Sequence, residues 1–162
     1  MKLIILMKNR LWYSSQVGQD NLLISIFENK MNGFFVDLAS NHWSLLSNTL
    51  ALEKYLNWQG LCIEPNPMYY DGILSNRKCR LISNPVYSYS NINVEFRFRE
   101  ATGGILASNR ETADMDNAKI SDPRSKDVNL TTVTLSTILD FFKAPHIIEY
   151  LSLDVEGMLE IF

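Results

Sequence analysis

The sequence predicts an α/β fold with a mostly parallel sheet, in one domain that spans residues 1–162. Three observations lead to this class. The first half of the chain alternates helical periods with short apolar runs, in the order helix, strand, helix, strand, helix, strand. The runs are apolar almost throughout, which is typical of strands that are buried on both faces. A chain of 162 residues is the size of one domain and can bury a substantial core.

The elements of this first half are bounded by capping residues, glycine and proline. Asp20 is placed to cap the first helix, and Gly33 ends it. Pro65 and Pro67 end the second strand and open the next helix. The predicted elements are a helix from residue 20, a strand over 34–38, a helix over 44–56, a strand over 61–63, a helix over 68–76 and a strand over 80–86. Helices between successive strands favour right-handed crossovers and therefore parallel strands.

The pattern changes in the second half of the chain. Residues 93–99 alternate strictly between apolar and polar, which predicts a strand with one face in water. Residues 101–130 have no apolar period, so we expect a long mobile loop there. A helix capped at Thr134 and ended by Pro145 follows, and 150–155 reads as another apolar strand.

Composition excludes several classes of partner. Fifteen Lys and Arg against eighteen Asp and Glu give a net charge of -3, so no basic field is present to hold nucleic acid or an anionic membrane. The apolar run 3–7 is too short for a secretory signal or a membrane span. We expect a soluble, cytoplasmic protein. Cys62 and Cys79 lie in no metal or C-x-x-C pattern and are expected to be reduced, partly buried thiols.

Polar and acidic residues follow three of the predicted strands. Asp37, Glu64 and Asp154 stand at or just beyond the strand ends, and the carboxyl ends of parallel strands form the usual ligand-binding edge of an open sheet. Glu64 follows Asp37 at about the spacing of the ribose-binding acid in dinucleotide folds, which predicts an adenosine-type ligand. The segment after Asp37 contains no glycine, so a pyrophosphate site, and with it a nicotinamide dehydrogenase, is disfavoured.

Six short blocks, in this order, resemble the FkbM family of S-adenosylmethionine-dependent methyltransferases. They are SQVGQD at 15–20, GFFVDL at 33–38, LSNT at 46–49, LEK at 52–54, WQGLCIEPNP at 58–67 and EYLSLDVEG at 149–157. Together they extend the similarity over residues 15–162. The resemblance implies a Rossmann-like class I methyltransferase fold, a three-layer sandwich around a mostly parallel sheet. It also implies S-adenosyl-L-methionine as cofactor and methyl transfer to an oxygen of a small-molecule or sugar acceptor.

The resemblance also assigns roles to individual residues of this chain. The residues implied to bind the cofactor are Asp37, Ser40 and Asn41 at its methionine part, Glu64 at the ribose and Asn84 at the adenine. Asp154 and Glu156 are implied to face the reaction centre, with Asp154 the first candidate for the base and Glu156 the second. No separate metal site is expected, although this acid pair could also hold a divalent ion.

Four alternatives remain open, three for single residues or pairs and one for the whole chain. Glu64 could be an acid that only ends its strand. Asp37 could serve only to hold the turn after its strand. Asp154 or Glu156 could cap a helix. The chain could also be a non-catalytic remnant of the fold that acts as a binding or interaction module.

Two departures from the family pattern bear on these alternatives. The loop after the first strand usually reads Asp-x-Gly-x-x-x-Gly, whereas this chain has Ala39 and Trp43 at the glycine positions. The family domain usually continues through about three more strands, so we expect a C-terminally truncated sheet that lacks its last strands. The strand over 150–155 would then have an open apolar edge, which predicts self-association.

Overall fold

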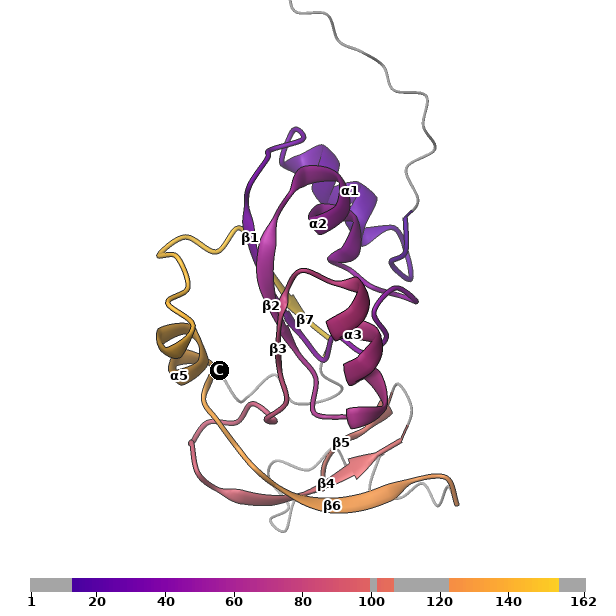
Figure 1. Ribbon diagram of the computed structural model, residues 1–162, viewed down its shortest axis with the longest axis vertical. Helices are drawn as coiled ribbons and strands as arrows, with labels where there is room; N and C mark the ends of the chain where they lie inside the picture. Colours follow the sequence, from indigo (N-terminus) through magenta and orange to yellow (C-terminus); the bar gives the residue numbers. More distant parts are fainter. Residues whose placement is uncertain (1–12, 100–101, 107–122, 155–162) are drawn as a thin grey trace, which may run out of the picture.

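A four-stranded parallel sheet forms the centre of the computed structural model, which describes residues 13–99, 102–106 and 123–154 (Figure 1). The strands are β1 (Phe34–Leu38), β2 (Gln59–Ile63), β3 (Arg80–Ile82) and β7 (Tyr150–Leu153), in the spatial order β3-β2-β1-β7. β1 is central and pairs with both β2 and β7. The prediction of an α/β fold with parallel strands is confirmed.

Helices cover both faces of this sheet (Figure 1). The first face carries α1 (Gln19–Ile26), α2 (Leu50–Leu56), the 3-10 turn η1 (Pro67–Tyr69) and α3 (Tyr70–Asn76), and the second carries α5 (Leu135–Phe141). Because side chains alternate along a strand, Phe35 packs into the core under α1 and α2, whereas Val36 packs into the core under α5. No described helix exceeds eight residues, and none of them is long and apolar enough to cross a membrane.

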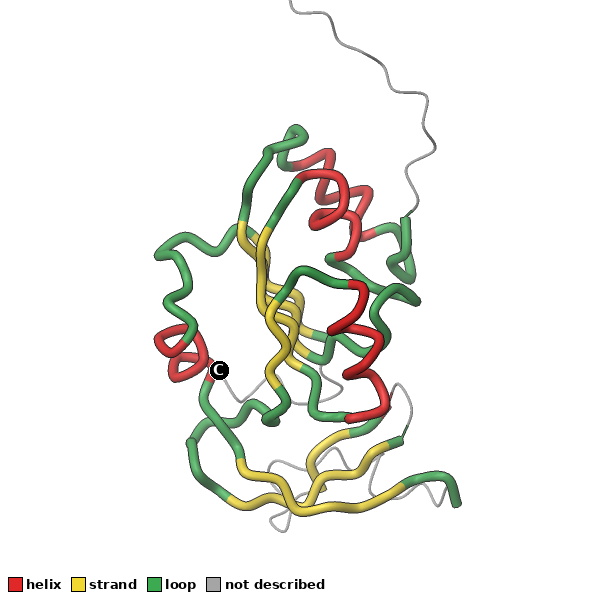
Figure 2. The backbone as a smooth tube through the Cα atoms, in the orientation of Figure 1, coloured by secondary structure: helices red, strands yellow, loops and turns green. Residues whose placement is uncertain are grey.

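A second, antiparallel sheet lies at the end of the molecule where β1, β2 and β3 finish (Figure 2). It consists of β4 (Asn93–Phe98) between β5 (Gly104–Leu106) and β6 (Lys126–Thr131). Val86, which follows β3, and Val133, which follows β6, form an isolated parallel β-bridge.

The prediction that 101–130 has no regular structure is therefore wrong at both ends, because β5 and most of β6 fall inside it; residues 107–122 lie outside the described ranges. The strands were missed because their pairing uses backbone hydrogen bonds while the side chains of β6 stay largely exposed, which leaves no apolar period.

Several element boundaries differ from those predicted, and for three of them the cause lies in nearby contacts or turns. α2 begins at Leu50 rather than residue 44, because the Ser47 hydroxyl accepts the Leu50 N–H (3.2 Å) just ahead of the helix. Asp20 lies inside α1, after the N-cap Gly18, and its buried carboxylate instead accepts the Ser14 N–H (2.7 Å). β3 ends at Ile82, since the chain then turns toward the antiparallel sheet.

The two cysteines form a disulfide, which corrects the expectation of reduced thiols. β2 and β3 are parallel neighbours, and Cys79, directly before β3, has its Cα atom 6.0 Å from that of Cys62 on β2. That separation suits a disulfide. Spacing in the sequence gave no sign of the pair, because the two residues become neighbours only when the strands align.

Candidate functional site

The ends of β1, β2 and β7 meet at one edge of the parallel sheet, here called the carboxyl edge. In the sheet register, Leu38 lies between Ile63 and Leu153. Asp37 is the penultimate residue of β1, while Glu64 and Asp154 directly follow β2 and β7. The structure thus brings together the three acids that the sequence placed at strand ends.

Glu64 is a buried carboxyl group held by backbone donors. The Asn66 N–H donates to Oε1 (2.7 Å) and the Asn41 N–H donates to Oε2 (2.9 Å), while Glu64 is only 5% exposed. Burial raises its pKa to about 7, although the two N–H donors act to lower it. Each oxygen accepts one of these bonds, and a carboxylate oxygen has capacity for a second. Glu64 can therefore accept further hydrogen bonds from a ligand.

Two polar side-chain atoms near this edge are buried without a partner. They are Ser40 Oγ and Asn48 Oδ1, neither of which has a hydrogen-bond partner among the described residues. Ser40 follows β1, and its N–H donates to the Ile63 carbonyl (3.2 Å). The Asn48 amide donates to the Ser152 hydroxyl on β7 (3.1 Å). Buried polar atoms are rarely left unpaired in folded proteins, so both atoms favour a polar ligand at the carboxyl edge.

Asp37 differs from Glu64 because its carboxylate is engaged inside the fold. The Thr49 hydroxyl donates to its Oδ2 (2.6 Å), and Asp37 is 2% exposed. Burial raises its pKa, while Thr49 and the nearby Arg77 guanidinium act to lower it. The carboxylate thus fastens the start of α2 to β1.

A buried ionic network, here called the Arg77 network, extends from Asp37 beneath α2. The Arg77 guanidinium donates to Thr49 Oγ1 (2.9 Å) and pairs with Glu53 at 3.3 Å between Nε and Oε2. Glu53 also accepts the backbone N–H of Lys78 (2.7 Å). This network was not predicted from the sequence. An acid within the otherwise apolar stripe of α2 was the one available signal, because a buried acid requires donors.

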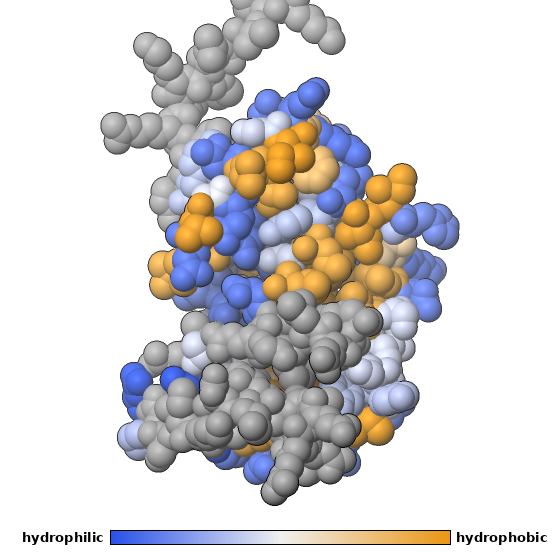
Figure 3. Space-filling model, turned by 180° about the vertical axis from the view of Figure 1, so that it is seen from behind, coloured by the Kyte–Doolittle hydropathy of each residue, from blue (hydrophilic) through white to orange (hydrophobic). Residues whose placement is uncertain are grey.

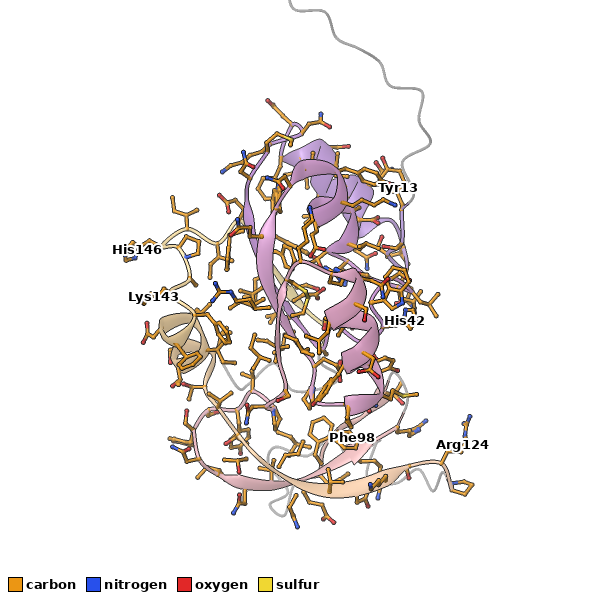
Figure 4. The ribbon with its side chains drawn as sticks, in the orientation of Figure 1. Tyr13, His42, Phe98, Arg124, Lys143 and His146 are labelled. Atoms are coloured by element: carbon orange, nitrogen blue, oxygen red, sulfur yellow. A yellow bond between two sulfur atoms is a disulfide. The ribbon has the colours of Figure 1, made fainter. Side chains whose placement is uncertain are left out.

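The loop after β1 contains no glycine, yet two residues at its start have a left-handed backbone conformation. Ala39 has φ 60° and Asn41 has φ 55°, both in the left-handed region that favours glycine. His42, on the α3 side of the molecule (Figure 4), accepts the Leu45 N–H at Nδ1 (2.9 Å) and so closes the following turn. The Trp43 indole packs on α3 in the space left by Gly72. Trp43 is thus accommodated as a packing residue.

The remaining predicted residues lie around this edge. Asp154 is exposed, and it acts on Asp37 by raising the pKa of that carboxyl. Asn84 is exposed beyond β3, and its amide donates to the Thr131 carbonyl at the end of β6 (3.0 Å). Glu156 lies outside the described residues. Within the described ranges, no three His, Cys, Asp or Glu side chains are grouped to hold a metal ion.

The arrangement of strands and acids agrees with a comparison with known protein families. The model of the methyltransferase FkbM domain matches residues 26–158, which includes every strand of the parallel sheet. No curated protein and no solved structure matches the chain. Because the match spans most of its length, the chain belongs to the FkbM methyltransferase family.

Proposed function

We propose that the protein is an S-adenosylmethionine-dependent methyltransferase of the Rossmann-like class I fold that methylates a hydroxyl of a small molecule or sugar. The family match supports methyl transfer. The strand order β3-β2-β1-β7 supports the fold, because β1 lies where the chain order reverses, which is where doubly wound sheets bind their ligands.

The observation that carries the proposal is the burial of Glu64 and the hydrogen bonds that orient its carboxylate. This acid is buried at the end of β2, is oriented by two backbone N–H groups and has acceptor capacity left. Two ribose hydroxyls are donors that match this capacity. Ser40 Oγ, which has no partner among the described residues, supplies a further polar contact on the neighbouring loop. These residues fit the nucleoside and amino-acid parts of the cofactor.

In this proposal the protein mainly positions the reactants. The cofactor, when bound, supplies an activated methyl group on a sulfonium centre. Asp154 is exposed at the end of β7, on the same edge as Glu64. An exposed carboxylate can accept the proton of an acceptor hydroxyl from solvent-accessible space. We therefore assign Asp154 the role of base and Asn84, beyond β3, a contact with the adenine.

Calorimetric titration with S-adenosylhomocysteine tests the binding part of the proposal. Glu64→Ala should weaken binding by about 1.5–3 kcal/mol, as expected for hydrogen bonds to a charged group. Glu95→Ala, at an exposed position of β4, is the matched control and should bind like the wild type. Equal binding by Glu64→Ala and the control would remove the ribose assignment. Binding without methylation of any hydroxyl acceptor would instead favour a non-catalytic binding module.

The proposal includes self-association through the outer edge of β7. β7 is the last strand on one side of the described sheet and lies behind β1 in Figure 1. Figure 3 shows the molecule from behind, where apolar side chains gather on the surface. Leu151 on this strand is 41% exposed, and an unpaired strand edge can pair with another chain. Sedimentation velocity should show dimers that Leu151→Lys reduces; a concentration-independent monomer would contradict this.

A further inference from the structure

A cleft lies at the end of the parallel sheet opposite the carboxyl edge, where the strands begin. It has a volume of about 640 Å³ and is lined by the starts of β1, β2 and β3 and by the chain that leaves α5. The volume falls within the usual range for small-molecule sites, roughly 300–1,000 Å³. β1 has five residues and so spans roughly 17 Å, which separates this amino-end cleft from the carboxyl edge.

Three cationic side chains line the amino-end cleft. Lys78 lies just before β3 and Arg80 is its first residue, and both line the cleft together with Phe142 at the end of α5. Lys143 follows α5 and lines the same cleft (Figure 4). Within the described part of the chain, no Asp or Glu lines the cleft. These three cations form a local concentration of positive charge in a protein whose net charge is -3.

Aromatic stacking orients one of these cations. The Arg80 guanidinium lies over the Phe142 ring, 5.6 Å from its centroid, which restricts the side chain while its N–H edge stays available. A planar guanidinium with a free edge matches two oxygens of a phosphate group. Gly60 and Pro145 add a wall without charged groups. The cleft therefore combines a phosphate-sized anion site with room for an organic group.

We propose that the amino-end cleft binds a phosphorylated small molecule, with its phosphate on Arg80, Lys78 and Lys143. This site is separate from the carboxyl edge and does not rest on the proposed methyl transfer. A ligand here cannot touch the reacting atoms across the length of β1. A ligand in the amino-end cleft would either regulate the enzyme or be the phosphorylated part of a substrate or carrier that is held there.

Titration with ribose 5-phosphate at low ionic strength tests the proposal, with ribose as the uncharged control. Ribose 5-phosphate should bind and ribose should not, and Arg80→Gln should weaken binding at least about tenfold, because it removes charged hydrogen bonds. Lys126→Gln, which removes an exposed charge from β6, should leave the affinity unchanged. Saturating S-adenosylhomocysteine should also leave the phosphate ester bound, because the two sites lie at opposite ends of the sheet.

Three results would overturn the proposal. One is the absence of binding by the wild type at millimolar ribose 5-phosphate, and another is equal weakening by Arg80→Gln and Lys126→Gln, which would indicate non-specific charge attraction. The third is competition with S-adenosylhomocysteine, which would place the ester at the carboxyl edge. If the three cations serve only the stability of the α5 side, Arg80→Gln will lower the unfolding midpoint and the wild type will bind no ester.

Discussion

Asp37 and Glu64 look alike in the sequence but occupy different surroundings in the fold. Both terminate apolar strands of the same sheet, and both are buried. The Asp37 carboxylate accepts a side-chain hydroxyl, from Thr49, and lies near a buried guanidinium. The Glu64 carboxylate, among the residues that the structure describes, accepts hydrogen bonds from two backbone N–H groups. Asp37 is thus part of a closed internal network, whereas Glu64 has acceptor capacity left for a ligand.

Because of this difference, Asp37 and its partners should affect the stability of the fold, whereas Glu64 should affect ligand binding. Changes near Asp37 should act on folding, because the Arg77 network ties α2 to β1 and to the start of β3. Changes at Glu64 should act on the ligand, because its partners are fixed main-chain groups.

The largest effect is expected from Arg77→Ala. This change leaves the Glu53 carboxylate buried without its partner, and breaking a buried ion pair costs about 3–5 kcal/mol of unfolding free energy. Arg97→Ala is the control, because Arg97 forms an ion pair with Asp127 (2.7 Å) at the surface of the antiparallel sheet. Denaturant unfolding should show a large loss for Arg77→Ala and a small one for Arg97→Ala. Similar losses in both variants would contradict the assignment of a stabilising network to Arg77.

Ala39→Gly is expected to raise the unfolding free energy, by less than Arg77→Ala lowers it. Ala39 has φ 60°, and the strain of a left-handed alanine exceeds the entropy that glycine adds to the unfolded chain by about 0.5–1 kcal/mol. The variant should therefore have a higher unfolding midpoint in thermal denaturation. Since the same loop carries Ser40, S-adenosylhomocysteine should bind at least as tightly as to the wild type. A lower midpoint would show that alanine is unstrained in this loop.

Much of the parallel sheet could be predicted from the sequence, and the antiparallel sheet only in part. Strands over 34–38 and 61–63 were found because burial on both faces leaves continuous apolar runs. β6 left no such signal because many of its side chains are exposed, and β5 left none because it has only three residues. The helix predicted from residue 44 was too long because a serine-rich turn interrupts what seemed a continuous helical period.

For the site, the sequence identified which acids stand at strand ends but not what each contacts. The convergence of Asp37, Glu64 and Asp154 follows from parallel strands alone. The engagement of Asp37 depends on Thr49 and Arg77, which are 12 and 40 positions further along the chain and meet it only after α2 and α3 pack. The Cys62–Cys79 disulfide was missed for the same reason, because strand register brings the two residues together.

The most direct test of the central claim is the pH dependence of S-adenosylhomocysteine binding. Burial raises the pKa of Glu64 to about 7, so the carboxyl is mostly protonated at pH 6 and mostly ionised at pH 8. The ionised form is the better acceptor for two ribose hydroxyls, so affinity should rise about tenfold from pH 6 to pH 8. Glu64→Gln, which cannot ionise, should bind more weakly and with no such rise. A wild-type affinity that is flat with pH, or the same rise in Glu64→Gln, would contradict the claim that Glu64 holds the cofactor.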